Sequence, residues 1–165
     1  MEAIYESPTP PTGHLDAFKM AGTVHFLLRD ETTGEIKEEW TQPNMMMNVG
    51  FAHIASRQKD ATAAAMGWIA IGTGGTALAA TQTLLVTEIA RVASSAPTLV
   101  TTTVTNDSIQ YVTTFGAGTG TGTLAEAGIF NIATANTAVM LCRTLFSVVK
   151  AAGDSLTITW TVKAA

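Results

Sequence analysis

The sequence is poor in charged residues and has a single cysteine. Asp, Glu, Lys and Arg make up only 13% of its 165 residues, against roughly a quarter in typical soluble domains. Much of the surface must therefore carry Thr, Ser, Ala and Gly side chains, which suggests a protein that works within an assembly. Because Cys142 has no second cysteine to pair with, an internal disulfide is excluded, and the fold is compatible with a reducing cytosol.

The chain also lacks an excess of basic residues and long apolar runs. Its net charge is -4, so it does not have the basic surface that draws proteins to nucleic acid or to anionic membranes. The longest apolar runs, such as residues 68–71 and 138–141, are far shorter than the roughly 18 residues of a membrane-spanning helix. The first residues show no export signal. We therefore expect neither nucleic acid nor a membrane as a direct partner.

What the sequence does contain is a series of short segments in which apolar and polar residues alternate. Alternation with a period of two is typical of β-strands that bury one face. Asp30 to Gly34 and Asn106-Asp107 supply turn residues between two such pairs of segments, which predicts two β-hairpins. The predicted strands cover residues 24–28, 36–40, 68–71, 100–104, 109–115, 129–130, 139–146 and 156–162.

This pattern predicts a mainly β fold. Short strands separated by Gly, Asn, Asp and Pro turns, with many Thr residues, favour an antiparallel β-sandwich, jelly-roll-like, over an alternation of helices and strands. One short helix is expected from Asn48, which can cap it, to Arg57, since Phe51, Ile54 and Ala55 recur at helical spacing. We expect one sandwich domain over residues 21–165.

Residues 1–20 have a different composition and predict an extended N-terminal arm. They carry three of the five prolines and no sustained period, and they include apolar side chains that a purely solvated tail would not need. We expect the arm to become ordered over a neighbouring subunit; the alternative is that it packs on its own sandwich. The candidate interface residues are Ile4, Tyr5, Pro10, Pro11, Leu15, Phe18 and Met20.

The segment GTGGTA, residues 72–77, matches a variant of the dinucleotide-binding fingerprint. That fingerprint also needs an acidic residue about 20 positions further on, and residues 91–93 are Arg, Val and Ala. A phosphate-binding loop of the other kind needs a lysine after its last glycine, where this chain has Thr76. The segment is therefore predicted to be a turn at the end of a strand, and no cofactor is expected.

The residues that could bind a metal or catalyse a reaction are scattered along the chain. No two of the three histidines stand at ligand spacing, and zinc needs three or four converging ligands, so no metal is expected. Cys142 lies inside an apolar run, where core packing is the more common role. The run Met45 to Met47 fits a pliable binding surface and a core filler equally well. The histidines are His14, His25 and His53.

The acidic residues Glu88, Glu126 and Asp154 stand singly among apolar neighbours. A hydrolase would need two carboxylates that converge, so we expect separate structural contacts and no enzymatic activity. Glu88 and Arg91 are three residues apart, which would pair them on a helix. On a regular strand, however, they would point to opposite faces.

Three sequence blocks, in this order, resemble a class of tailed-bacteriophage virion proteins. The first, GTVHFLLRDETTGEIKEEWTQPNMMMNVGFAHIASR, is similar to a hairpin with a TG turn and a short helix after it. The second, WIAIGTGGTALAATQTLLVTEIARV, carries a GTG turn and an L-x-x-E-I-A-R segment. The third, TLAEAGIFNIATANTAVMLCRTLFSVVKAAGDSLTITWTVK, is similar to the closing block of that class. Together they cover most of residues 22–163.

The resemblance implies a structural protein whose motif residues shape the fold. It covers capsid decoration (cement) proteins and small tail-fibre or baseplate proteins. Because the chain ends close to its last predicted strand, we expect a decoration protein, made in the host bacterial cytoplasm and placed on the capsid exterior, that stabilises the lattice of the major capsid protein. The implied scaffold positions are Gly72, Gly74, Glu88, Arg91, Glu126, Gly128, Asn131, Arg143 and Asp154.

Two further expectations concern partners. Residues 97–115 carry few of the lysines and prolines that usually protect an edge strand, which predicts that copies of the chain form a dimer or trimer. The alternative to a capsid protein is a tail-fibre or baseplate adaptor, or a receptor-binding component. In that case Trp68 and Tyr111 are candidates for stacking on a glycan.

Overall fold

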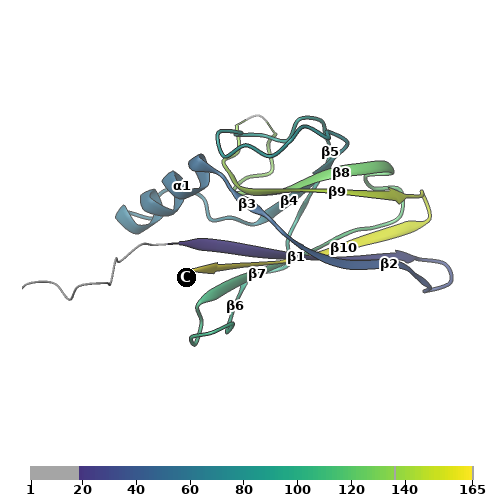
Figure 1. Ribbon diagram of the computed structural model, residues 1–165, viewed down its shortest axis with the longest axis horizontal. Coiled ribbons are helices and arrows are strands. Elements are labelled where there is room, and N and C mark those ends of the chain that lie inside the picture. The colour runs from purple at the N-terminus through teal and green to yellow at the C-terminus, as the bar shows by residue number, and fades with distance from the viewer. Residues whose placement is uncertain (1–18, 136, 165) are drawn as a thin grey trace, which may run out of the picture.

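The structure, a computed structural model, describes residues 19–135 and 137–164. Two five-stranded antiparallel sheets face each other, and one helix, α1 (Asn48–Lys59), covers one end of the pair (Figure 1). Sheet A has the order β2 (Ile36–Pro43), β1 (Met20–Asp30), β10 (Asp154–Ala164), β7 (Ser108–Phe115) and β6 (Thr98–Val100). Sheet B has the order β3 (Met45–Met46), β9 (Met140–Lys150), β8 (Gly122–Phe130), β4 (Trp68–Gly72) and β5 (Glu88–Ala93). The predicted antiparallel β-sandwich is confirmed.

Alternation along the strands creates the core between the sheets. In sheet A, β1 and β10 pair so that Val24 lies opposite Trp160 and Phe26 opposite Ile158, and all four side chains are fully buried. The ring of Phe26 also stacks on Trp40 of β2, with ring centroids 4.7 Å apart. Since successive side chains of a strand point to opposite faces, this register brings the apolar side chains of neighbouring strands together on the inner face of the sheet.

Sheet B buries apolar side chains on its outer face as well. A second cluster lies there, separate from the core between the sheets, and is covered by the long connections that follow β4 and β8 (Figure 1). The connections therefore form a third layer over sheet B. The buried members of the cluster are Met47, Ala70, Leu85, Phe130, Ala138 and Met140.

The helix begins where it was predicted but without the predicted cap. Met47 occupies the N-cap position, and no side chain caps the helix, so the role expected for Asn48 is wrong. The backbone N–H of Asn48 instead donates to the carbonyl of Ala80, at 2.8 Å. Gly50 lies against the backbone of Leu141 in β9, so closely that a Cβ atom would overlap the Leu141 carbonyl. Backbone contacts with sheet B therefore fix the start of this helix.

Two strand boundaries also differ from the sequence-based expectation. The predicted strand 100–104 stops at Val100, because the carboxylate of Asp107 accepts the backbone N–H groups of residues 102 to 104 and winds that segment into a turn. These hydrogen bonds hold the pKa of Asp107 well below its usual range. Met20, which the sequence placed in the arm, is the first residue of β1 and pairs with Ala164.

The methionine run and the cysteine belong to the interior. Met46 and Met47 are buried in the two clusters, so of the two interpretations of this run the structure supports core filler. Cys142 is fully buried, and burial raises the pKa of its thiol well above the ordinary value. The thiol therefore stays protonated at neutral pH and packs as a small apolar side chain.

We predict that Asp154 makes the stability of the fold sensitive to acid. Its buried carboxylate accepts the Nζ of Lys37 at 2.5 Å and the N–H of Ala151 at 2.9 Å. The Lys37 contact first, and the backbone N–H second, hold its pKa below the ordinary 3.8. A carboxyl whose pKa is lower in the folded than in the unfolded state stabilises the fold above the unfolded pKa, and this contribution is lost as the pH falls.

Asp154→Asn should therefore unfold more easily than the wild type at pH 6 and lose less stability between about pH 5 and pH 2. Urea unfolding midpoints across this range measure the effect. Glu38→Gln, which changes an exposed carboxylate on β2, is the matched control and should follow the wild type. Equal pH dependence in Asp154→Asn and the wild type would contradict the assignment.

Candidate functional site

Two opposite charges are buried side by side on the outer face of sheet B. Glu126 of β8 and Arg143 of β9 have fully buried side chains, and the Nη2 of Arg143 lies 2.8 Å from the Oε2 of Glu126. The Nε of Arg143 donates to the same oxygen at 2.9 Å. Glu126 makes its own structural contact here, as expected for the acidic residues, since Glu88 and Asp154 pair with other partners. A buried ion pair needs further hydrogen bonds to offset the loss of its hydration.

The connection between β4 and β5, residues 73–87, supplies those hydrogen bonds. Glu126 accepts the backbone N–H groups of Gly74, Val86 and Thr87 at distances of 2.7 to 3.1 Å. Arg143 donates to the carbonyl of Thr76 at 3.0 Å and to the side-chain oxygen of Gln82 at 2.8 Å. The ion pair therefore anchors both ends and the middle of this connection to sheet B.

The glycines of the GTGGTA segment are explained by this anchor. A Cβ atom on Gly74 would lie 2.5 Å from the Oε1 of Glu126 and 2.6 Å from the Cβ of Val86, and one on Gly72 would overlap the carbonyl of Thr87. The N–H of Gly74 already donates to a carboxylate, which would repel a phosphate at the same place. These contacts support the interpretation of the segment as a turn.

Glu88 and Arg91 form a second ion pair, which the sequence did not predict. The Nε and Nη2 of Arg91 lie 2.8 and 2.7 Å from the two carboxylate oxygens of Glu88. The expectation that these residues point to opposite faces is wrong because β5 contains a bulge: Ala90 pairs with Ile71, but Glu88 pairs with Gly72, the next residue of β4. Ile89 is the extra residue of this bulge, and it places the side chains of Glu88 and Arg91 on the same face of the sheet.

The pair packs on the second apolar cluster. The guanidinium of Arg91 lies 3.9 Å from the centre of the Phe130 ring, and its Nη1 donates to the carbonyl of Ile132 at 2.8 Å. At the base of the same connection after β8, Asn131 accepts the N–H of Val139 at 2.7 Å. The motif residues on this face therefore hold the two long connections in place, which fits a role in shaping the fold.

The two histidines that the structure describes belong to different elements. His25 contacts Glu39 at 2.9 Å on an exposed part of sheet A, His53 belongs to α1, and His14 lies outside the described residues. Within residues 19–135 and 137–164, no three His, Cys, Asp or Glu side chains are arranged to hold a metal ion. In the same part of the chain, no helix is long and apolar enough to cross a membrane.

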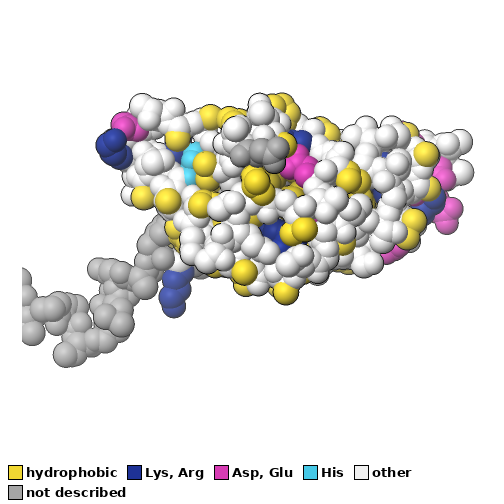
Figure 2. All heavy atoms as spheres, turned by 90° about the horizontal axis from the view of Figure 1, so that it is seen from above, with side chains coloured by type: hydrophobic (Ala, Val, Ile, Leu, Met, Phe, Trp, Pro, Cys, Tyr) yellow, Lys and Arg dark blue, Asp and Glu magenta, His cyan; other side chains and the backbone are white. Residues whose placement is uncertain are grey.

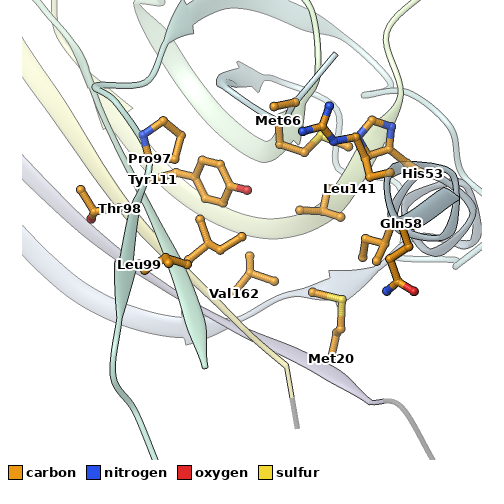
Figure 3. A pocket seen from close by; sticks show the side chains of 14 residues that line it. Met20, His53, Gln58, Met66, Pro97, Thr98, Leu99, Tyr111, Leu141 and Val162 are labelled. Carbon is orange, nitrogen blue, oxygen red and sulfur yellow. The ribbon is translucent and has the colours of Figure 1, made fainter. Parts of the chain in front are cut away.

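A groove of about 610 Å³ lies between α1 and the inner face of sheet A, at the end of the sandwich where β1 begins (Figure 3). We call it the helix groove. One wall comes from sheet A, where Leu99 pairs with Ile109 and Ile109 with Val162, so that their side chains form a row across three strands. Met20 of β1 continues this wall. The lining is mainly apolar, as in most binding clefts.

The opposite wall of the helix groove comes from α1 and carries its polar groups. His53, Arg57 and Gln58 line it, and the hydroxyl of Tyr111 points into the groove from sheet A (Figure 3). Burial and the nearby Arg57 lower the pKa of His53, so its ring is neutral at neutral pH. Burial raises the pKa of Tyr111 to about 12, so its hydroxyl remains a hydrogen-bond donor.

Exposed aliphatic side chains continue from the helix groove to the edge of sheet A. The three-residue β6 is an edge strand, Leu99 is 61% exposed, and Ile109 on the neighbouring β7 is 37% exposed. Charged side chains are few on the face over sheet B and lie mostly towards the two ends (Figure 2). Because its lining is mainly apolar and continues into the exposed Leu99 and Ile109, the helix groove is the best candidate for an interaction surface.

Among the predicted interface residues, Met20 lines the helix groove. The other six, Ile4, Tyr5, Pro10, Pro11, Leu15 and Phe18, lie outside the described residues. Trp68 packs against the cluster on the outer face of sheet B, whereas Tyr111 belongs to the core between the sheets. The structure therefore does not bring these two candidate glycan-stacking residues together.

We predict that breaking the Glu126–Arg143 pair strongly destabilises the fold. Glu126→Gln leaves a buried, unpaired guanidinium, which should lower the free energy of unfolding by about 3 to 5 kcal/mol in urea titrations. Combining Glu126→Gln with Arg143→Met removes the unpaired charge. The double variant should therefore lose less unfolding free energy than the two single variants lose in sum. Glu39→Gln, at an exposed contact, should cost at most about 1 kcal/mol. Strictly additive losses would contradict this role.

We also predict opposite behaviour of two adjacent glycines. Gly74→Ala places a methyl group against Glu126 and Val86 and should cost about 1 to 3 kcal/mol of unfolding free energy. Gly75→Ala meets nothing within 4 Å and should change stability by no more than about 0.5 kcal/mol. Thermal unfolding of the two variants measures the difference, and similar losses would show that the carboxylate is not what excludes a side chain at residue 74.

Comparison with known proteins adds no relative. No protein-family model matches the chain, and no match is found among curated proteins or solved structures. The function must therefore be argued from the sequence pattern and from the surfaces described above.

Proposed function

We propose that the protein is a structural virion component of a tailed bacteriophage, a decoration protein that sits on the capsid exterior and contacts the major capsid protein. The order of the three sequence blocks between residues 22 and 163 supports this proposal. The low fraction of charged residues, 13%, also supports it, because such a surface suits repeated contacts within an assembly.

One structural observation carries the proposal furthest. The buried charged groups of the described chain have structural partners: Glu126 with Arg143, and Asp154 with Lys37. These groups tie connections and turns to the sheets, which is a structural role. The helix groove and the exposed Leu99 and Ile109 beside it form a mainly apolar surface, which fits binding to other proteins.

Self-association belongs to the same proposal. Within the described residues β6 is the last strand of sheet A, and an edge strand with backbone groups that face no further strand favours pairing with another chain. A dimer or trimer that covers this edge would present a repeated unit to a symmetric capsid lattice. In the alternative, a tail-fibre or baseplate component, the same edge would contact neighbouring tail subunits.

The copy number of the protein in purified virions tests the proposal. A protein that decorates the capsid lattice should be present in hundreds of copies, in fixed proportion to the major capsid protein, because the lattice repeats its binding site. Quantitative mass spectrometry of intact particles measures the ratio, and the portal protein serves as an internal reference of low copy number. A few to a few dozen copies would defeat the capsid proposal and favour the tail component.

A further inference from the structure

The helix groove and the N-terminal segment meet at Met20. Met20 is both the first residue of β1 and part of the groove lining, and only Lys19 separates it from residues 1–18. The row of Val162, Ile109 and Leu99 runs from this point across the inner face of sheet A (Figure 3). A chain that enters β1 is therefore next to Val162 on β10, and it reaches Leu99 by running over β10 and β7 on the inner face of the sheet.

We propose that residues 15–18 of the same chain occupy the helix groove, with Phe18 and Leu15 seated on the row formed by Val162, Ile109 and Leu99. This inference does not depend on a role in a virion. It favours, for these four residues, the alternative in which the N-terminal segment packs on its own sandwich.

The length of chain fits this assignment. In sheet A the order β1, β10, β7, β6 places three strand spacings between Met20 and Leu99, and the register places Leu99 level with Gly22, two residues along β1. The distance from Met20 to Leu99 is therefore about 16 Å, and the five steps of chain from Leu15 to Met20 span at most about 17 Å when extended. Leu15 can therefore reach the far end of the row, and Phe18 the near end, without any movement of the sandwich.

The chemistry of the two partners is also complementary. The row is apolar and incompletely covered, so Leu99 and Ile109 keep water-exposed surface that Leu15 and Phe18 could cover. Residues 1–18 contain three acidic residues and neither lysine nor arginine, and one of them, Asp16, adjoins Leu15. The facing wall carries Arg57, whose described hydrogen bonds go to the carbonyls of Ala61 and Ala63.

The same chain is favoured over a second copy as the source of the segment. A ligand joined to its site by one residue, here Lys19, acts at a high effective concentration, whereas a segment from another chain must compete at the much lower protein concentration. Occupation of the groove should therefore not change on about a hundredfold dilution.

Two double variants test whether residues 15–18 fill the helix groove. Leu15→Ser combined with Phe18→Ser should lower the melting temperature of the full chain by about 4 to 8 °C and should shift the methyl NMR signals of Leu99, Ile109 and Val162. Ile4→Ser combined with Tyr5→Ser, a matched pair outside residues 15–18, should change neither. Equal effects of the two double variants, or no effect of either, would overturn the proposal.

A groove-side variant tests the contact itself. Leu99→Ser should lower the melting temperature of the full chain, and this loss should shrink when Leu15 and Phe18 are already serine, since contacting residues are not additive. Val149→Ser is the control, because Val149 is 65% exposed, like Leu99 at 61%, and lies eight residues beyond Leu141 along β9. Additive losses for Leu99→Ser would overturn the proposal.

Dilution then separates the two possible sources of the segment. The methyl signals of Leu99 and Ile109 should keep their positions when the full chain is diluted about a hundredfold. If these signals move on dilution towards those of the Leu15→Ser, Phe18→Ser variant, the groove is filled by a second copy, and the assignment to the same chain is wrong.

Discussion

The ion pair between Glu126 and Arg143 is the constraint on which the outer layer of this protein depends. Two full charges lie on a sheet face with no access to water, and such charges are tolerated only when nearby groups complete their hydrogen bonds. The connection after β4 supplies three N–H groups and a carbonyl to them. If this connection took another course, the buried charges of Glu126 and Arg143 would lose these hydrogen bonds. The ion pair therefore fixes the course of about fifteen residues that form no helix or strand.

That path in turn sets the position of the helix. The carbonyl of Ala80, in the connection held by the pair, accepts the N–H of Asn48 at the start of α1. Met47, one residue earlier, donates to the carbonyl of Leu141 in β9. With both contacts made, the helix extends past the end of sheet B and faces the inner side of sheet A. The helix groove is thus a consequence of how the outer connection is fixed.

Sequence periodicity predicted most strands of sheet A and the turn between β1 and β2, but in sheet B it missed β3, β5 and most of β8. The alternation in residues 24–28 and 156–162 predicted β1 and β10 because burial on one face repeats every two residues. The hairpin turn at Asn106-Asp107 was predicted, but its length was not, since one carboxylate that accepts three N–H groups leaves no periodic signal. For the same reason, the bulge in β5 and its Glu88–Arg91 pair could not be derived from spacing.

The candidate interaction surface was even less accessible from the sequence. Leu99, Ile109 and Val162 come from three strands and lie in one row only because of the register of β6, β7 and β10, which depends on long-range pairing. The sequence placed Met20 in the arm because residues 1–20 contain three prolines and show no sustained period. In the structure Met20 is the first residue of β1.

Four charged side chains of the described residues are buried and serve the interior of the fold. Lys150 is buried and donates to the carbonyl of Gly116 at 2.9 Å, and burial lowers its pKa. Together with Arg143, Glu126 and Asp154, it fixes turns and connections that apolar packing alone would leave undefined. Because these four buried charges make their hydrogen bonds inside the fold, they are not available to direct partners electrostatically. The helix groove has a mainly apolar lining instead, so binding there would depend on shape and apolar contact.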